Sequence, residues 1–250
     1  YPQLKVFSNN DNNTIRLNSE IYSRVIRFTY GTGSKNNPYI IRNEEDMKAL
    51  SDITLSDNLD GIYFKVEDGV KTLDLTPEEL GFVSIGRGSG VNQQFRGGFD
   101  GNEVTIIIND NRTTTNYVGL FGYLGQGSEV KNITIEGNIH GRDRVGSLAG
   151  EANGSIITNI RNNAEVKGRQ YVGGLIGVIT DTTIENSYNM ADVTTTSRDI
   201  GGLVGWGQRS TINNAFNYGN ITASIVVGGI IGYANNNMTI NNVYNRGSIT

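Results

Sequence analysis

Cysteine is absent from the 250-residue sequence, and histidine occurs only once. Without cysteine there is no disulfide framework, no thiolate metal site and no thiol nucleophile. With His140 alone, the chain cannot form the two-histidine motif of zinc peptidases. The net charge is −4 and basic residues do not cluster, so no face is suited to neutralising nucleic-acid phosphates. We therefore predict no metal site, no cofactor and no nucleic-acid partner.

Long apolar runs are also missing. No stretch approaches the roughly 18–20 apolar residues that a membrane-spanning helix requires, which predicts no membrane insertion by this sequence. Proline is scarce (3 residues) whereas glycine is abundant (33), a composition that favours turns and short strands over helices. The sequence begins with Tyr1 rather than methionine, and no signal peptide is visible. We interpret it as a piece cut from a longer chain and expect it to be monomeric.

What the sequence does contain is one segment repeated five times. The copies begin at Val118, Val145, Val172, Ile200 and Val227, and each continues with glycine and a short apolar run. The distances between successive starts are 27, 27, 28 and 27 residues. A period held this closely over five copies is typical of a stacked repeat architecture, in which each unit packs on its neighbours.

Each copy contains three short strand-like segments separated by turns. In the third copy these segments are 172–176, 182–186 and 187–194. Three short strands per copy describe one coil of a parallel β-helix, whose core becomes continuous only when coils stack. We therefore predict an all-β fold, a parallel β-helix (β-solenoid) over residues 95–250, preceded by an N-terminal α/β capping region.

Aligned positions of the five copies indicate which side chains point inward. Four columns at every second position, beginning at Ile133, Ile135, Gly137 and Ile139, are mostly apolar or small, although the second becomes asparagine in later copies. Alternate residues of a strand share one face, so these columns predict the core. The column between the first two points outward and comprises Thr134, Arg161, Tyr188, Phe216 and Tyr244. Its last three members predict an exposed aromatic row, which either stabilises the coils by stacking or binds a ligand.

A further column is asparagine in all five copies: Asn132, Asn159, Asn186, Asn214 and Asn242. An amide at the same place in every coil can hydrogen-bond its equivalents above and below. We predict a structural ladder that satisfies buried turn groups rather than a ligand site.

Residues 30–94 precede the repeats and predict the capping region. Asn43 can cap a short helix with acidic residues in its first turn, and Met47 and Leu50 give that helix one apolar face. So short a helix is marginal alone and must pack on something, while a solenoid end needs a cover because bare strand edges invite other chains. Residues 1–29 are expected to be linker strands that end a preceding module.

The copies resemble GLUG repeats, named for a Gly-Leu-x-Gly core that occurs here at 119–122 and 202–205. The upstream stretch is similar to what precedes such repeats, so the resemblance covers roughly residues 30–250. GLUG repeats occur in large bacterial surface proteins, including adhesins and non-catalytic regions of IgA-cleaving metallopeptidases. The resemblance implies a secreted module at the bacterial cell surface and, by analogy, a right-handed solenoid. It supplies no ligand, because the motif is a building unit rather than a site.

Parallel β-helices also include polysaccharide lyases and hydrolases, which makes such an enzyme an alternative. Those reactions need clustered carboxylates as acid–base pairs or metal ligands. Acidic residues are absent from 200–250, so a site could only lie near Asp100, Glu129, Glu151 or Asp181. We interpret these four as solvated charges and His140 as an outward side chain, and we predict no catalytic residues.

The sequence thus favours a non-catalytic repeat module that adheres to a host or matrix glycan or protein, or that acts as a stalk presenting other domains. An accessory region of a secreted metallopeptidase is a further alternative. An ice-binding face is disfavoured, because threonine columns of the last copies lapse to Glu129 or Lys167 in earlier ones. Tyr188, Phe216 and Tyr244 are the candidate ligand-binding residues.

Overall fold

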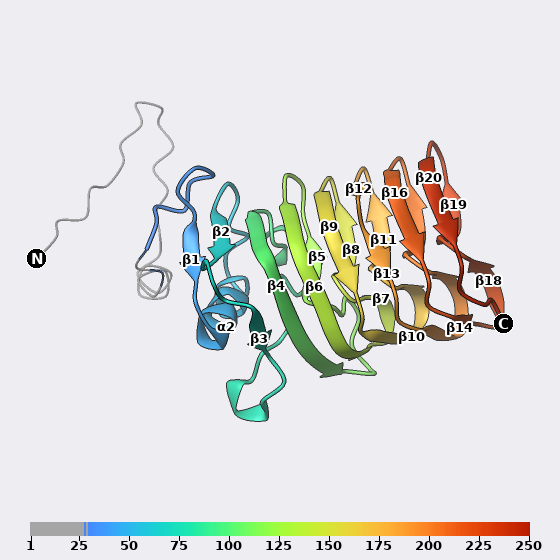
Figure 1. Cartoon of the computed structure of the whole chain (residues 1–250), viewed down its shortest axis with the longest axis horizontal. Coiled ribbons are helices and arrows are strands. Elements are labelled where there is room, and N and C mark those ends of the chain that lie inside the picture. The colour runs from blue at the N-terminus through green and yellow to red at the C-terminus, as the bar shows by residue number, and fades with distance from the viewer. Residues whose placement is uncertain (1–27, 29) are drawn as a thin grey trace, which may run out of the picture.

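The computed structural model describes Phe28 and residues 30–250. Within this part of the chain, strands follow one another in a stack of coils (Figure 1). One sheet has 15 strands and a second sheet has 5. This architecture confirms the predicted all-β parallel solenoid. The predicted end of a preceding module, residues 1–29, lies outside the described residues apart from Phe28.

Each coil has three sides. The first side comprises β1 (Tyr39–Ile41), β2 (Tyr63–Val66), β4 (Gly98–Asn111), β6 (Glu129–His140), β9 (Ile156–Asn162), β12 (Thr183–Glu185), β13 (Tyr188–Asn189), β16 (Thr211–Asn217) and β20 (Thr239–Asn245). The second side, part of the same large sheet, comprises β7 (Asp143–Gly146), β10 (Glu165–Gly173), β14 (Val193–Gly201), β17 (Ile221–Thr222) and β18 (Ile225–Gly228). The short strand β3 (Thr72–Asp74) pairs with β4 and therefore belongs to the first side. The third side is the smaller sheet: β5 (Phe121–Leu124), β8 (Ala149–Asn153), β11 (Ile176–Thr180), β15 (Val204–Gln208) and β19 (Ile231–Asn235).

Strand pairing reproduces the sequence period. All the paired strands are parallel, and from β6 onward partner residues in successive coils are 27 or 28 positions apart. The first residues of the five copies are themselves register partners: Val118 pairs with Val145, Val145 with Val172, Val172 with Ile200 and Ile200 with Val227. Aligning the repeats by sequence therefore yields the correct register.

The core runs through the middle of the stack as columns of inward side chains. Two of the predicted columns are buried in four successive coils: Ile133, Ile160, Ser187 and Ala215, and Ile139, Val166, Val193 and Ile221. Their fifth members lie in the last coil, where Val243 is only partly buried and Ile249 is 48% exposed. Each coil buries its apolar side chains against the coils on either side of it. Because buried apolar area stabilises by about 25 cal/mol per Å², these neighbouring coils supply most of its stability.

The region before the long strands belongs to the same stack. β1 pairs with β2 and β2 with β4, so the large sheet begins at Tyr39. Helix α2 (Glu44–Ile53) lies at this end (Figure 1), and the side chain of Asn43 caps it by accepting a hydrogen bond from the Asp46 N–H at 3.0 Å. Met47 and Leu50 are fully buried in the core. The boundary expected at residue 95 therefore marks a change to complete coils, whereas the sheet itself begins earlier.

Two single-turn helices, η1 (Glu78–Leu80) and η2 (Val91–Gln93), connect α2 and the first strands to β4. Pro77 is the residue that immediately precedes the first of these helices. None of the helices in residues 30–250 is long and apolar enough to cross a membrane.

Candidate functional site

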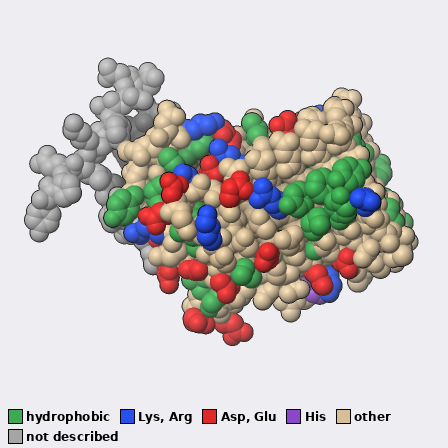
Figure 2. All heavy atoms as spheres, viewed as in Figure 1, with side chains coloured by type: hydrophobic (Ala, Val, Ile, Leu, Met, Phe, Trp, Pro, Cys, Tyr) green, Lys and Arg blue, Asp and Glu red, His purple; other side chains and the backbone are tan. Residues whose placement is uncertain are grey.

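Aromatic side chains form a stacked row on the outside of the last three coils. Tyr188, Phe216 and Tyr244 are register partners on β13, β16 and β20. The ring centroids of the first pair are 4.6 Å apart with an interplanar angle of 7°, and those of the second are 5.1 Å apart at 11°. Tyr188 and Phe216 are half-buried, whereas Tyr244 is 45% exposed. Figure 2 shows a hydrophobic patch over these C-terminal strands, with basic side chains at both of its ends.

Tyr218 and Arg246 extend the row. The ring of Tyr218 stands edge-on to those of Phe216 and Tyr244, and its hydroxyl lies 3.2 Å from the Tyr244 hydroxyl. The Arg246 guanidinium lies 5.7 Å from the centroid of the Tyr218 ring. The hydrogen bond between the hydroxyls, helped by Arg246, lowers the pKa of Tyr218, and the same bond raises the pKa of Tyr244. Sequence reasoning missed Tyr218, because only one of the five copies is aromatic at that position.

The rings of the row lie against one another rather than flat on the surface. The π face carries the negative part of an aromatic quadrupole, and it is through this face that a ring binds cations. In the row, Phe216 has both faces covered by its neighbours, so it offers a ligand mainly its edge. Each stacked pair is worth about 0.5–1.5 kcal/mol beyond its buried area. The geometry favours stacking between coils as the role of the row, and ligand binding stays a prediction.

The predicted asparagine ladder lies at a corner of the coils. Its five residues all have positive φ, between 48° and 60°, a conformation that asparagine tolerates better than most residues. Asn159 donates its amide to Asn132, Asn214 to Asn186 and Asn242 to Asn214, at 3.0, 3.3 and 2.7 Å. Among the described residues the ladder is interrupted between Asn159 and Asn186. The last three asparagines are exposed, so the expectation that they satisfy buried groups is wrong; the amides bond to one another at the surface.

A second asparagine ladder runs through the core. Asn162, Asn189 and Asn217 are fully buried, and each donates its amide to the next asparagine along the stack, ending at Asn245, over 2.6–2.7 Å. Each of the four also donates to the main-chain carbonyl two residues further on. Sequence alignment placed this column inside but assigned it no role. The feature of the sequence that could have revealed this ladder is an asparagine that recurs among columns whose other residues are apolar or small.

The double glycine of the repeat makes room for this inner ladder. A Cβ placed on Gly202 would lie 2.4 Å from the Cγ of Asn217, and similar contacts would arise at Gly174 and Gly229, at 2.6 and 2.7 Å. In the first copy, which has a single glycine, the inward residue of the ladder column is Ile135, whereas the second copy combines a single glycine and Ser147 with the buried Asn162. The close contacts therefore favour glycine beside the asparagine in the last three copies, but the buried asparagine does not require the glycine pair.

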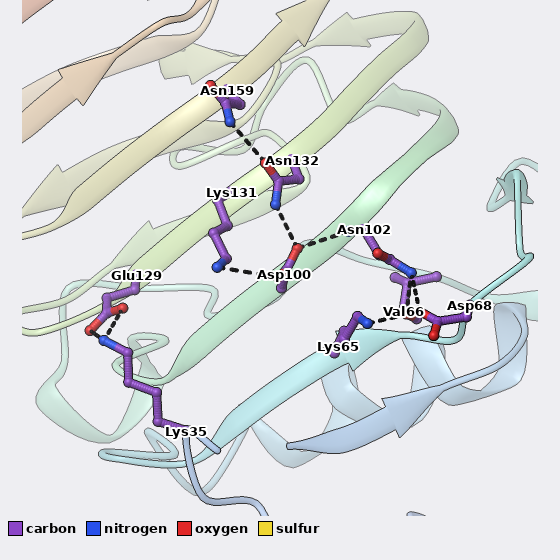
Figure 3. Close-up of polar contacts among 10 residues, drawn as sticks. All are labelled: Lys35, Lys65, Val66, Asp68, Asp100, Asn102, Glu129, Lys131, Asn132 and Asn159. Carbon is purple, nitrogen blue, oxygen red and sulfur yellow. Dashed lines mark hydrogen bonds and ion pairs between the residues drawn. The ribbon is translucent and has the colours of Figure 1, made fainter. Parts of the chain in front are cut away.

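Two of the four carboxylates considered for catalysis lie on neighbouring strands near the N-terminal end (Figure 3). The Asp100 carboxylate is 3.3 Å from the Lys131 ammonium and accepts a hydrogen bond from Asn132 at 2.9 Å. It thereby ends the outer asparagine ladder with an ionic group. The Glu129 carboxylate accepts two hydrogen bonds from the Lys35 ammonium, both at 2.7 Å. Each carboxylate is thus neutralised by a lysine of its own.

Asp181 is held in the same way. Its two carboxylate oxygens each accept a hydrogen bond from the Arg209 guanidinium at 2.8 Å, which lowers the pKa of Asp181. Across the part of the chain that the structure describes, no three histidine, aspartate or glutamate side chains are placed to hold a metal ion.

Glu151, the fourth carboxylate, lies in a cluster on the third side of the coils. It sits beside Tyr123 on the adjacent strand, and its Oε2 is 2.7 Å from the Nε of Arg144. The Arg144 guanidinium lies over the rings of Tyr117 and Tyr171, 5.2 and 5.5 Å from their centroids. Burial raises the pKa of Glu151 although Arg144 opposes this, and burial raises the pKa of Tyr123 to about 12. The expectation that Glu151 is a solvated charge is wrong, because the side chain is largely buried.

Two shallow hollows lie on the surface beside the C-terminal ends of β4 and β6 and beside β10. They have volumes of about 260 and 330 Å³, and His140, half-buried at the end of β6, lines both. Glu165 and Lys167 line the first hollow and form an ion pair at 3.0 Å. Arg142 and Arg169 line the second. Neither hollow brings together any two of the four carboxylates considered for catalysis.

Residues 168–194 match the GLUG motif family. The matched stretch begins in β10, includes β11 and ends at the start of β14, which amounts to one complete coil. The other four copies are its register partners above and below.

Two curated proteins are similar to part of the chain. A Gly-rich membrane protein of Evansella cellulosilytica is 32% identical over 113 residues, which is 44% of this chain and 12% of that protein. Halomucin of Haloquadratum walsbyi is 31% identical over 124 residues, which is 48% of this chain and 1% of that protein. The chain thus spans only a small fraction of the length of either relative.

A solved structure has a similar fold. It is a protein of Bacteroides ovatus described as an immunoglobulin A1 protease, and it superposes with a TM-score of 0.61 over 86% of this chain and 76% of that one. The two sequences are 20% identical, a level at which the likeness shows the fold alone. The chain carries the GLUG motif on a parallel β-solenoid, which confirms the resemblance drawn from its repeats.

Proposed function

We propose that this chain is a non-catalytic repeat module of an extracellular bacterial cell-surface protein. The coils form an elongated stack (Figure 1), which can hold neighbouring domains away from the cell as a stalk. The long sides of the stack offer a surface for adhesion to host or matrix glycans and proteins.

The observation that carries this proposal is how the polar and aromatic side chains are used. Most side chains that could perform chemistry or bind ligands already interact with other side chains of the protein. The asparagines hydrogen-bond to asparagines, the aromatic rings stack on one another, and the carboxylates pair with lysine or arginine. A glycan-cleaving β-helix needs two cooperating carboxylates or a metal-binding set. Here Asp100, Glu129, Glu151 and Asp181 each have a basic partner of their own.

The comparisons support a location at the cell surface. One relative is named a membrane protein and another halomucin, and the solved structure with a similar fold is described as a protease of immunoglobulin A1. The last name favours one further context, in which such a module is an accessory region of a secreted peptidase. The peptidase chemistry would then belong to another domain, since this sequence has one histidine and no cysteine.

An array of glycans and matrix proteins, probed with the purified fragment, tests the proposal. We expect retention on at least one ligand class and no release of products from polysaccharides incubated with the fragment. A variant with Tyr188, Phe216 and Tyr244 all changed to alanine is the matched probe for the aromatic row. We expect a lower melting temperature and unchanged ligand retention, because the rings cover one another. Polysaccharide cleavage would overturn the non-catalytic assignment, and lost retention without lost stability would make the row a binding site.

A further inference from the structure

The second of the two hollows has the chemistry of an anion-binding site. We call it the arginine hollow; it is lined by Thr113, Thr114, His140, Arg142, Arg169 and Thr196. These side chains come from four separate stretches of chain: the segment after β4, the turn from β6 to β7, β10 and β14. Both arginines and all three threonines are exposed. The hollow therefore combines cationic groups and hydroxyls on an accessible concave surface.

The two arginines of the hollow share one carboxylate. Asp143, nearly buried beneath them, accepts hydrogen bonds from Arg169 Nε at 2.8 Å and from Arg169 Nη2, a bidentate pair that neutralises that guanidinium. The Nε of Arg142 lies 3.8 Å from the same carboxylate, beyond hydrogen-bonding distance. No aspartate or glutamate is among the residues that line the hollow. One positive charge is therefore left to meet an anion from solution.

The neighbouring hollow gives this site a direction. It shares His140 with the arginine hollow but is lined by Asp110 and Glu165, which are paired with Arg112 and Lys167. The charges of the neighbouring hollow are thus balanced, so an acidic group is attracted to the arginine side only. A ligand that spans both hollows would place its neutral hydroxylated part toward the neighbouring hollow, where carboxylates can accept hydrogen bonds from hydroxyls.

We propose that the arginine hollow binds the acidic group, a carboxylate or a sulfate, of a host or matrix glycan. A guanidinium presents a planar fork of donors that matches such groups in a bidentate manner, and threonine hydroxyls can bond to the sugar or to a remaining oxygen. This inference rests on the adhesive part of the proposed function and names the ligand class. Carboxylated and sulfated sugars share the chemistry, so the experiment includes both.

Isothermal titration of the fragment with 3′-sialyllactose, a chondroitin sulfate oligosaccharide and neutral lactose tests the site. We expect one or both acidic probes to bind, lactose to bind at least tenfold more weakly, and added NaCl to weaken the acidic interaction because it is partly exposed. The variant Arg142→Gln should weaken binding about tenfold, since it removes a charge-assisted pair. Arg142 has only a long ion pair to lose, so melting temperature should stay unchanged.

The control is Arg209→Gln, which removes the same charge from an exposed arginine in the turn that follows β15. It should bind the acidic probes like the unaltered fragment. Equal losses in both variants, or equal binding of lactose, would overturn the inference. The array can also find a ligand that the Arg142→Gln variant retains as well as the unaltered fragment does. That result would refute the arginine hollow as the binding site but leave the adhesive function in place. If no probe on the titration or the array binds, both the site and the adhesive role fail, and only the stalk role remains.

Discussion

At the scale of single residues, the backbone at the corners of the coils explains part of the repeat. The outer asparagines all have positive φ, yet a second corner with φ of 54–60° is occupied by Tyr117, Arg144, Tyr171, Asp199 and Val226. Positive φ therefore does not by itself require asparagine. What distinguishes the asparagine column is that its amides also bond along the stack. The two requirements together account for one residue type in all five copies.

Replacing Asn214 separates these two requirements. Asn214→Ala should lower the free energy of unfolding by about 1–2 kcal/mol, because alanine is strained at φ 49° and both amide bonds are lost. Asn214→Gly should recover much of that loss, since glycine adopts positive φ without strain. Chemical denaturation of both variants gives the comparison. If glycine is as destabilising as alanine, the amide bonds rather than the backbone decide the residue type.

Glu151 predicts a measurable pH dependence. An acid whose pKa is raised in the folded state binds its proton more tightly there than in the unfolded chain. Its contribution to stability is therefore present at low pH and is lost as the pH rises from the ordinary value of 4.5 through the folded value. Across that rise, the free energy of unfolding of the unaltered protein should fall relative to that of Glu151→Gln.

Urea unfolding at a series of pH values checks this expectation. The matched control is Glu165→Gln, because the Glu165 side chain is 51% exposed and pairs with an equally exposed lysine. Its stability profile should run parallel to that of the unaltered protein. A parallel profile for Glu151→Gln as well would mean that Arg144 compensates fully for the burial of the carboxylate.

At the scale of a strand, alternation decides the effect of a substitution. Val193 is fully buried between its partners Val166 and Ile221, whereas Ser248 is exposed. Val193→Asp should cost more than about 4 kcal/mol or prevent folding, because an unpaired charge enters the core. Ser248→Asp should be nearly neutral, since Asp192 already occupies the same column two coils earlier. Equal losses in thermal melts would refute the assignment of inward and outward columns.

The same alternation explains how much could be predicted from the sequence. A fixed period and four aligned columns were enough for the register and the core, because stacking places equivalent residues one above another. The role of the inner asparagines was missed, since polarity alone does not reveal a partner that comes from the next coil. Positive φ at Arg144 or Val226 leaves no mark in residue type. The arginine hollow could not be predicted either, because it joins Thr113 and Thr196 from stretches with no shared motif.

At the scale of the whole molecule, the stack is one-dimensional and its two described ends differ. At the N-terminal end α2 places Met47 and Leu50 in the core, both fully buried. In the last coil several apolar side chains are exposed: Ile225, Val226, Tyr233, Ile240, Tyr244 and Ile249. In such a protein each coil contacts only its neighbours, so local opening is expected to start where a coil has one neighbour rather than two.

Amide hydrogen exchange should therefore be graded along the stack. In the isolated fragment of residues 1–250, we expect the amides of β19 and β20 to exchange faster than those of β8 and β9, their equivalents three coils earlier, because opening that coil of the fragment breaks only one interface. Equivalent positions have the same place in the repeat, so the position of each amide within its strand is matched in the comparison. Val243→Ala should speed exchange in the last coil further while leaving β8 and β9 unchanged, since Val243 packs at the interface with β16. If instead all coils are equally protected, and Val243→Ala changes the exchange of all of them by the same factor, the solenoid opens as a single cooperative unit.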